Sequence, residues 1–308
     1  MTDGASTTQV VVMGRLCADL YPEQLRTPLA EVETFRRFVG GFAGNVATGL
    51  ARLGVDCAIV SAVGDDGFGE YVRGYLEREG VDCRHLSTHP TLRTALAFCE
   101  AWPPDRFPIT FYRTPTCPDW ELRFGDLDVD ALVEPPLALV TGTGLAREPS
   151  RTATLGVLRA RAARGMRTIF DADWRAQLWE APEEYPVVAG LAAGAADIVV
   201  GGDGELEAAG LGPESADVVV IKHGPDGVTV HQRGASSRIP PMPVEVVNGL
   251  GAGDAFLAAF SAGLLEGLDP VAAARRGSGA GALVATRLAC SDAMPTRPEL
   301  EQFLGAHA

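Results

Sequence analysis

The chain has 308 residues, of which 46% are hydrophobic and 21% are charged, as in globular proteins that bury a sizeable core. Its 26 basic and 40 acidic residues give a formal net charge of −14 at pH 7, which opposes non-specific binding to nucleic acid and to anionic membranes. The sequence has no apolar run near the roughly 18 residues of a membrane span and no signal-peptide pattern at its start. We therefore expect a cytoplasmic protein with neither nucleic acid nor membrane as a partner.

Short apolar strands alternate with helices along most of the chain. Strands are predicted at 9–13, 57–63, 137–140, 168–170, 198–200 and 218–221, and helices at 44–53, 67–79, 151–164 and 182–193. Strands that are apolar throughout and separated by helices favour a mostly parallel sheet with both faces covered. The pattern predicts an α/β fold, and the length allows two domains or one large domain with an elaboration.

Two segments, 17–39 and 81–112, interrupt this alternation. Both are polar with β-type patches, and neither contains a convincing helix. They predict a small β-rich lid over the ligand edge of the main sheet, with ordinary surface hairpins as the alternative. The six cysteines are scattered without a CxxC pair, which favours buried thiols over a disulfide framework or a zinc site.

A glycine-rich turn at 248–254 opens a helix expected at 257–265. Glycines let backbone N–H groups approach an anion closely, and the helix N-terminus adds its positive dipole end. Asp254 follows Gly251, Ala252 and Gly253, so its carboxylate is placed to accept a hydroxyl proton during phosphoryl transfer. A simple N-cap aspartate is the alternative. Lys222 is the single lysine and is not part of a Walker A motif, so any nucleotide must bind in another cradle.

A second glycine cluster, Gly40-Gly41-Phe42-Ala43-Gly44, leads through Asn45 into the helix near the N-terminus. Paired glycines admit a ligand against the backbone, and an asparagine amide both donates to and accepts from the hydroxyls of a polyol. The cluster lacks the spacing of a dinucleotide-binding fingerprint.

Together the two clusters resemble the two signatures of the ribokinase-like carbohydrate kinases, the phosphofructokinase B group, over nearly the whole chain. The resemblance implies one kinase domain over 1–308, a three-layer α/β sandwich with a mostly parallel central sheet and a small β lid. It also implies ATP as phosphoryl donor, Mg²⁺, and often a monovalent cation such as K⁺. A lid of this kind has exposed strand edges, through which we expect a possible homodimer.

The resemblance also implies roles for individual residues. Asp254 matches the catalytic base, and the backbone of Gly251, Ala252 and Gly253 matches the anion hole. Further residues are assigned by position: Asp19, Gly41, Asn45 and Asp173 to the substrate, Lys222, Gly224, Gly251, Gly253 and Ser278 to the nucleotide, and Glu205 to the metal. The sequence departs from the family pattern at Gly202 and at Asn248-Gly249, where the family usually has Asn and Asp-Thr.

Two arginines favour an acidic sugar as substrate. Arg113 and Arg175 resemble residues that bind the substrate carboxylate in sugar-acid kinases of the family, since bidentate cations suit carboxylates. Surface arginines paired with aspartates are the alternative. With aspartates at positions 19 and 173, the chain resembles the branch that phosphorylates 5-dehydro-2-deoxygluconate in inositol breakdown more than the branch that acts on 2-dehydro-3-deoxygluconate, and this resemblance implies the first acid as substrate. A nucleoside kinase and a non-catalytic sensor of the same fold remain further alternatives.

Overall fold

The computed structural model describes residues 8–104 and 106–307. Its main sheet contains β1 (Val10–Met13), β4 (Cys57–Gly64), β5 (Leu86–His89), β8 (Leu137–Thr141), β9 (Arg167–Asp171), β10 (Ile198–Gly202), β11 (Val218–Lys222), β12 (Val228–Gln232) and β13 (Ala235–Ile239). Within the described residues the strand order is β13-β12-β11-β10-β9-β8-β1-β4-β5, and all neighbours are parallel except at β12. The predicted, mostly parallel sheet is confirmed.

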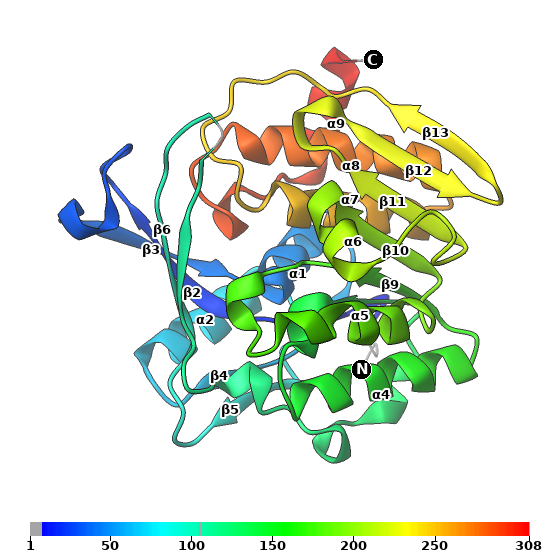
Figure 1. The fold of residues 1–308 in the computed structure, drawn as a ribbon. Coiled ribbons are helices and arrows are strands. Elements are labelled where there is room, and N and C mark those ends of the chain that lie inside the picture. Colours follow the sequence, from blue (N-terminus) through cyan, green and yellow to red (C-terminus); the bar gives the residue numbers. More distant parts are fainter. Residues whose placement is uncertain (1–7, 105, 308) are drawn as a thin grey trace, which may run out of the picture.

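Helices cover both faces of this sheet. One layer contains α1 (Phe42–Arg52), α2 (Gly67–Arg78), α7 (Ala252–Leu265), α8 (Pro270–Ala285) and α9 (Arg297–Ala306), and the other contains α3 (Val129–Val133), α4 (Ser150–Ala163), α5 (Tyr185–Ala193) and α6 (Asp203–Ala209) (Figure 1). Side chains alternate along each strand, so Val10 and Val12 pack into the first layer and Val11 and Met13 into the second. The three-layer sandwich is confirmed.

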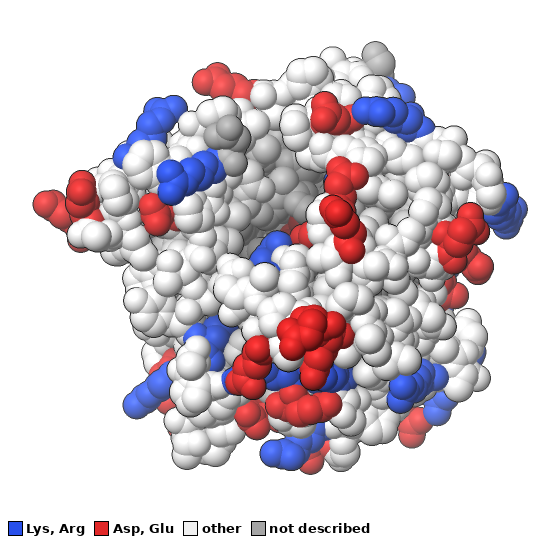
Figure 2. All heavy atoms as spheres, viewed as in Figure 1, with Lys and Arg blue, Asp and Glu red and all other residues white. Residues whose placement is uncertain are grey.

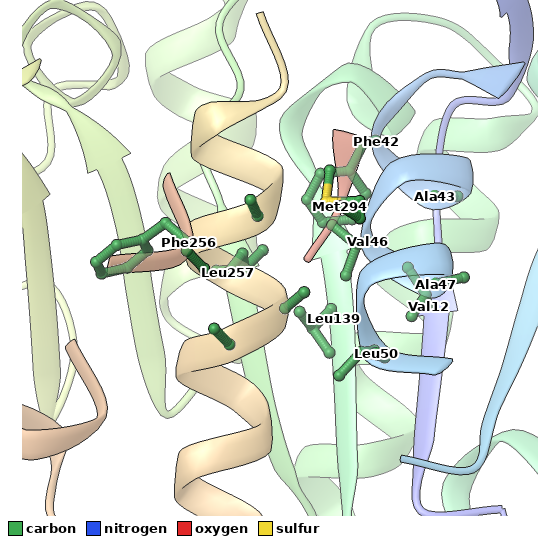
Figure 3. Packing of buried hydrophobic residues seen from close by; sticks show 14 of the residues in the cluster. Val12, Phe42, Ala43, Val46, Ala47, Leu50, Leu139, Phe256, Leu257 and Met294 are labelled. Atoms are coloured by element: carbon green, nitrogen blue, oxygen red, sulfur yellow. The ribbon is translucent and has the colours of Figure 1, made fainter. Parts of the chain in front are cut away.

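The helices α1 and α7 pack closely against each other. Figure 3 shows Val46 and Leu50 of α1 facing the side of α7 that carries Leu257, with Met294 between the two helices. A Cβ on Gly49 would lie 2.7 Å from the Cβ of Ala258, so the close approach requires a glycine at this position. The contact fixes the N-terminal ends of both helices relative to one another.

A second, four-stranded sheet forms the lid. It has the order β3-β2-β6-β7, from β2 (Cys17–Pro22), β3 (Phe35–Gly40), β6 (Leu96–Cys99) and β7 (Ile109–Tyr112). These strands stand beside the main sheet, at the left of Figure 1, and Figure 2 shows the surface hollowed between them and the rest of the chain. Acidic and basic side chains are both visible at the lower rim of this hollow.

The predicted lid segment 81–112 is too long at its start. Leu86–His89 pairs in parallel with β4 and extends the main sheet, so the lid begins only at β6. The sequence hides this edge strand because Leu86 is its one buried residue. All six cysteines are free thiols and five are buried, as predicted. Across residues 8–104 and 106–307, no helix has the length and apolar character needed to cross a bilayer.

Candidate active site

Five parallel strands end at the same edge of the main sheet, and each is followed there by a residue of the candidate site. Arg15 follows β1, Thr143 follows β8, Asp173 follows β9, Glu205 follows β10 and Gly224 follows β11. Ligands of open α/β sheets bind outside the carboxyl ends of the strands. The lid and the N-terminal ends of α1 and α7 meet the same edge, so the residues predicted from distant motifs converge on one site.

Asp254 lies in the first turn of α7. This helix begins at Ala252, within the predicted glycine-rich turn, because Gly251 adopts a left-handed conformation (φ +84°) that turns the chain directly into the helix. Burial, followed by repulsion from Asp173, raises the pKa of the Asp254 carboxyl to about 6. Above that pH the carboxylate is ionised and able to accept a proton.

Asn45 holds the Asp254 carboxylate in place. Its Nδ2 donates to Oδ2 of Asp254 at 2.7 Å, and its own Oδ1 is buried without a partner among the described residues. Both side chains lie near helix N-termini fixed by the α1–α7 contact. The pair therefore offers an oriented carboxylate next to a free amide oxygen, which suits a polyol that donates one hydroxyl to the amide oxygen and loses the proton of another hydroxyl to the carboxylate.

Asp173 is the most fully bonded carboxylate of the site. Its Oδ2 accepts from the hydroxyls of Thr141 (3.0 Å) and Thr143 (3.1 Å), and its Oδ1 pairs with Nη2 of Arg175 at 3.0 Å. Although burial opposes ionisation, the nearby charges of Arg175 and Arg15 hold the pKa of Asp173 below its ordinary value. With its lone pairs used in this way, Asp173 orients Arg175 and is poorly placed to hold a substrate hydroxyl on its own.

Lys222, at the end of β11, lies beside the glycine-rich turn. Its Nζ is 3.0 Å from Oδ2 of Asp171, and a Cβ on Gly253 would lie 3.4 Å from the same nitrogen. Burial raises the pKa of Asp171 while the lysine charge opposes that rise. The first N–H groups of α7 have no intrahelical acceptor, so the lysine and these amides form a cradle for an anion next to Asp254.

Glu205, the expected metal ligand, is already bonded within the protein. Its Oε2 accepts from the backbone N–H of Gly202 at 2.7 Å, and its Oε1 accepts from Nη1 of Arg175 at 3.1 Å. No group of three or more His, Cys, Asp or Glu side chains with metal-binding geometry occurs in the part of the chain that the structure describes. The residues present do not fit a metal held directly by Glu205.

The lid contributes Asp19 to the site. Asp19 is buried on β2, where the Cys17 thiol lies 3.1 Å from its Oδ1, and burial raises the pKa of its carboxyl to about 6. The neighbouring Gly41 carries φ +83°, and a Cβ there would lie 2.5 Å from the Arg15 carbonyl oxygen. Gly41 is thus required by a close backbone approach between β1 and α1.

Arg113 lies deeper than expected for a residue that meets a ligand. Its Nη2 is 2.5 Å from Oδ1 of Asp119, both side chains are 2% exposed, and its guanidinium covers the ring of Trp120 at 4.5 Å. The other oxygen of Asp119 accepts from the backbone N–H of Leu16 at 2.8 Å. The pair supports the backbone behind the site.

Two predicted nucleotide-side residues lie on separate elements. Gly224 has φ +56° and open space around the position of a Cβ, so a ligand has access to its backbone. Ser278 lies on α8, and its Oγ is buried without a partner among the described residues. A Cβ on Gly281, one turn further on, would lie 3.0 Å from the carbonyl oxygen of Ala252, so α8 passes next to the start of α7.

Sequence reasoning missed four residues of this site: Arg15, Thr141, Thr143 and Asp171. Each lies at or just beyond the carboxyl end of a parallel strand. That position was the available signal, because polar side chains there face the ligand edge of the sheet. None of the four belongs to a glycine-rich motif.

Comparisons with known proteins agree with this geometry. Residues 7–297 match the family described as pfkB family carbohydrate kinase. A 5-dehydro-2-deoxygluconokinase from Clostridium tetani is 33% identical over 320 residues, which cover 98% of this chain and 94% of that protein. The 5-dehydro-2-deoxygluconokinase of Bacillus subtilis is 32% identical and covers 97% of this chain and 96% of its own.

Solved structures have the same fold. A PfkB protein from Polaromonas sp. JS666 superimposes with a TM-score of 0.84 at 28% identity, covering 96% of this chain and 99% of its own. An uncharacterized sugar kinase from Pyrococcus horikoshii in complex with ATP gives a TM-score of 0.87 at 27% identity, covering 97% and 99%. The resemblance drawn from the two glycine motifs thus extends to the whole chain.

Proposed function

The chain belongs to the pfkB family of carbohydrate kinases and is a phosphotransferase that acts on a sugar hydroxyl; from this premise we propose that it transfers the γ-phosphoryl group of ATP to the terminal hydroxyl of 5-dehydro-2-deoxygluconate. The observation that carries the proposal is the Asp254 carboxylate, oriented by Asn45 beside the anion cradle. The shared name of the relatives supports the choice of substrate. Inositol catabolism is the corresponding proposed context.

In the proposed reaction Asp254 accepts the proton of the terminal hydroxyl. The hydroxyl oxygen forms a bond to the γ-phosphorus of ATP as the bond to the β-bridging oxygen breaks, which gives the 6-phosphate and ADP. The backbone N–H groups of Gly251, Ala252 and Gly253 and the Lys222 ammonium stabilise the negative charge on the transferring group. A base with a pKa near 6 is ionised at neutral pH, so the proton transfer requires no prior activation.

The remaining predicted residues are proposed to bind the two substrates. Asp19 accepts hydrogen bonds from sugar hydroxyls, Asn45 both accepts and donates them, and Arg175, held in place by Asp173, supplies positive charge for the carboxylate. Arg113, which sequence reasoning also assigned to the carboxylate, is paired with Asp119 and is proposed to support the site from behind. Gly41, Gly224 and Ser278 line the approach to the sugar and the nucleotide. Mg²⁺ would enter the site with ATP as part of the substrate, and Glu205, whose oxygens are bonded to Gly202 and Arg175, is not proposed to hold it directly.

The decisive experiment measures ADP release by the purified protein with Mg-ATP and each of two isomers, 5-dehydro-2-deoxygluconate and 2-dehydro-3-deoxygluconate. We expect strong preference for the first. Preference for 2-dehydro-3-deoxygluconate would support the kinase activity but show that the proposed substrate is wrong. Binding of either acid without ADP release would indicate a sensor. Replacing K⁺ by choline in the same assay tests for the monovalent cation.

The lid is also proposed to form a homodimer contact. Phe35, Phe98 and Tyr112 form a row of edge-packed rings across three of its strands, with centroids 5.4 Å and 5.1 Å apart, and Tyr112 is 60% exposed. Of these three rings Tyr112 is the exposed one, and it lies on edge strand β7, whose free edge suits a contact with a second copy. Light scattering should give twice the chain mass, and Tyr112→Asp should reduce it to one chain; a monomeric parent protein would remove the proposal.

A further inference from the structure

Arg15 lies where the main sheet, the lid and α1 meet. It follows β1, and its carbonyl accepts from the backbone N–H of Ala43 at 3.0 Å. Its guanidinium carbon lies 5.3 Å from the centre of the Phe111 ring on β7, and its side chain is only 10% exposed. The backbone contact and the aromatic ring together fix a buried cation between the two sheets.

The guanidinium of Arg15 uses little of its hydrogen-bonding capacity. Its Nη2 is 3.5 Å from Oδ2 of Asp173, at the outer limit of a hydrogen bond, and its Nε is buried without a partner among the described residues. Asp173 does not depend on this contact, because Arg175 and the hydroxyls of Thr141 and Thr143 already bond to it. A buried donor without an acceptor costs free energy that an incoming anion recovers.

Arg113 has a different environment, although its Nε and Nη1 also find no hydrogen-bond partner in the part of the chain that the structure describes. Its charge is balanced by Asp119 at 2.5 Å, and Asp119 in turn holds the backbone of Leu16, the residue after Arg15. Removing either partner would leave a buried charge uncompensated. Arg113 is therefore suited to keep the Arg15 segment in place, whereas Arg15 is suited to meet a ligand.

Two anions can reach this site, a substrate carboxylate and the transferring phosphoryl group. Lys222 lies beside Gly253 and supplies positive charge on the phosphoryl side. Arg15 packs against Phe111 of the lid, and its positive charge opposes the rise in pKa that burial causes at both Asp19 and Asp254. This position favours the carboxylate.

We propose that Arg15 binds the carboxylate of the sugar-acid substrate through its planar guanidinium and so determines the preference for acids over neutral sugars. The inference rests on the proposed function, and it transfers to Arg15 the role that sequence reasoning gave to Arg113. Arg175 remains the second cation, held in place by Asp173.

The test compares Arg15→Lys, which keeps the charge and loses the bidentate geometry, with Arg36→Lys, an exposed position on lid strand β3. Loss of a charge-assisted hydrogen bond should raise the KM for the acid about 10- to 100-fold. We expect kcat and the KM for ATP to stay within about twofold, since the phosphoryl cradle is untouched. The control variant should match the parent protein.

A neutral substrate makes the test independent of the variant's folding. The parent protein should prefer the acid over its carboxamide by about 10- to 100-fold, and Arg15→Lys should reduce that preference, because the lysine keeps the charge but loses the paired hydrogen bonds. An unchanged KM for the acid, or a loss confined to kcat and the KM for ATP, would overturn the role of Arg15 and leave the kinase proposal standing. If the parent protein phosphorylates only 2-dehydro-3-deoxygluconate, the proposed substrate is wrong and Arg15 is tested on that acid. Activity on neutral sugars alone would overturn both.

Discussion

The sheet-edge half of the site and the lid half each hold a buried carboxyl group whose pKa is raised to about 6, Asp254 and Asp19. Burial is the main cause in both cases, but the neighbours differ. Asp254 accepts a 2.7 Å hydrogen bond from an amide that is fixed by helix packing. Asp19 is approached by the weakly donating Cys17 thiol at 3.1 Å.

We therefore propose different functions for Asp254 and Asp19, although their carboxyl groups have similarly raised pKa values. Asp254 lies in the first turn of α7, beside the backbone amides and the Lys222 ammonium that face a phosphoryl group. Asp19 lies on lid strand β2, and we propose that its carboxylate accepts hydrogen bonds from substrate hydroxyls. A perturbed pKa identifies a candidate site, and the groups around each carboxylate decide which reaction step it serves.

The substitution Asp254→Asn tests this comparison most severely. The amide keeps the shape and can still accept from Asn45, but it cannot take a proton, so kcat should fall by about 100-fold or more while the KM for the sugar acid changes little. In the parent protein kcat should fall as the pH drops below about 6, because protonation removes the base. Initial rates with Mg-ATP across pH 5–8 measure both; near-native turnover of the variant would exclude Asp254 as the base.

Lys222→Met should produce the next largest effect. Loss of a charge-assisted contact to the phosphoryl group should lower kcat/KM for ATP about 10- to 100-fold. The lysine charge also lowers the pKa of Asp254, so the acidic limb of the rate profile should move to higher pH. In Lys222→Met the buried carboxylate of Asp171 loses its partner, and the double variant Asp171→Asn/Lys222→Met removes this unpaired charge. Recovery of activity in the double variant would mean that Lys222 serves only to neutralise Asp171.

Asp19→Asn should affect binding rather than chemistry. Exchange of a carboxylate for an amide weakens hydrogen bonds to sugar hydroxyls, and we expect the KM for the sugar acid to rise about 10-fold with a small change in kcat. The acidic limb near pH 6 should persist, because Asp254 is unchanged. Steady-state kinetics with the sugar acid as variable substrate provide the measurement. Loss of that limb in Asp19→Asn would reverse the roles assigned to the two carboxylates.

The elements that the sequence predicts well are those with strong local signals. Asp254 and Asn45 could be predicted as candidate site residues because each follows a glycine-rich turn that opens a helix. Both helix starts and glycine-rich turns have clear sequence signals. The contact between them is tertiary, since it depends on the packing of α1 against α7. Arg15 was not predicted as a site residue, because a single arginine after a strand is not part of a recognisable sequence motif. Its contact with Phe111, 96 positions later in the chain, is a tertiary contact that the sequence does not indicate.

The last and smallest effect concerns stability. Folding raises the pKa of Asp254, so the ionised carboxylate disfavours the folded state; this penalty is complete above pH 6 and disappears as the pH falls toward the ordinary pKa of an aspartate. Asp254→Asn removes the ionisable group, and its Tm should exceed that of the parent protein by about 2–6 °C at pH 7.5. At pH 4.5 the difference should shrink, because the parent carboxyl is then protonated in the fold. Calorimetry at the two pH values measures the difference in Tm. If the Tm advantage of Asp254→Asn were larger at pH 4.5 than at pH 7.5, the ionised carboxylate would stabilise the folded state, contrary to this prediction.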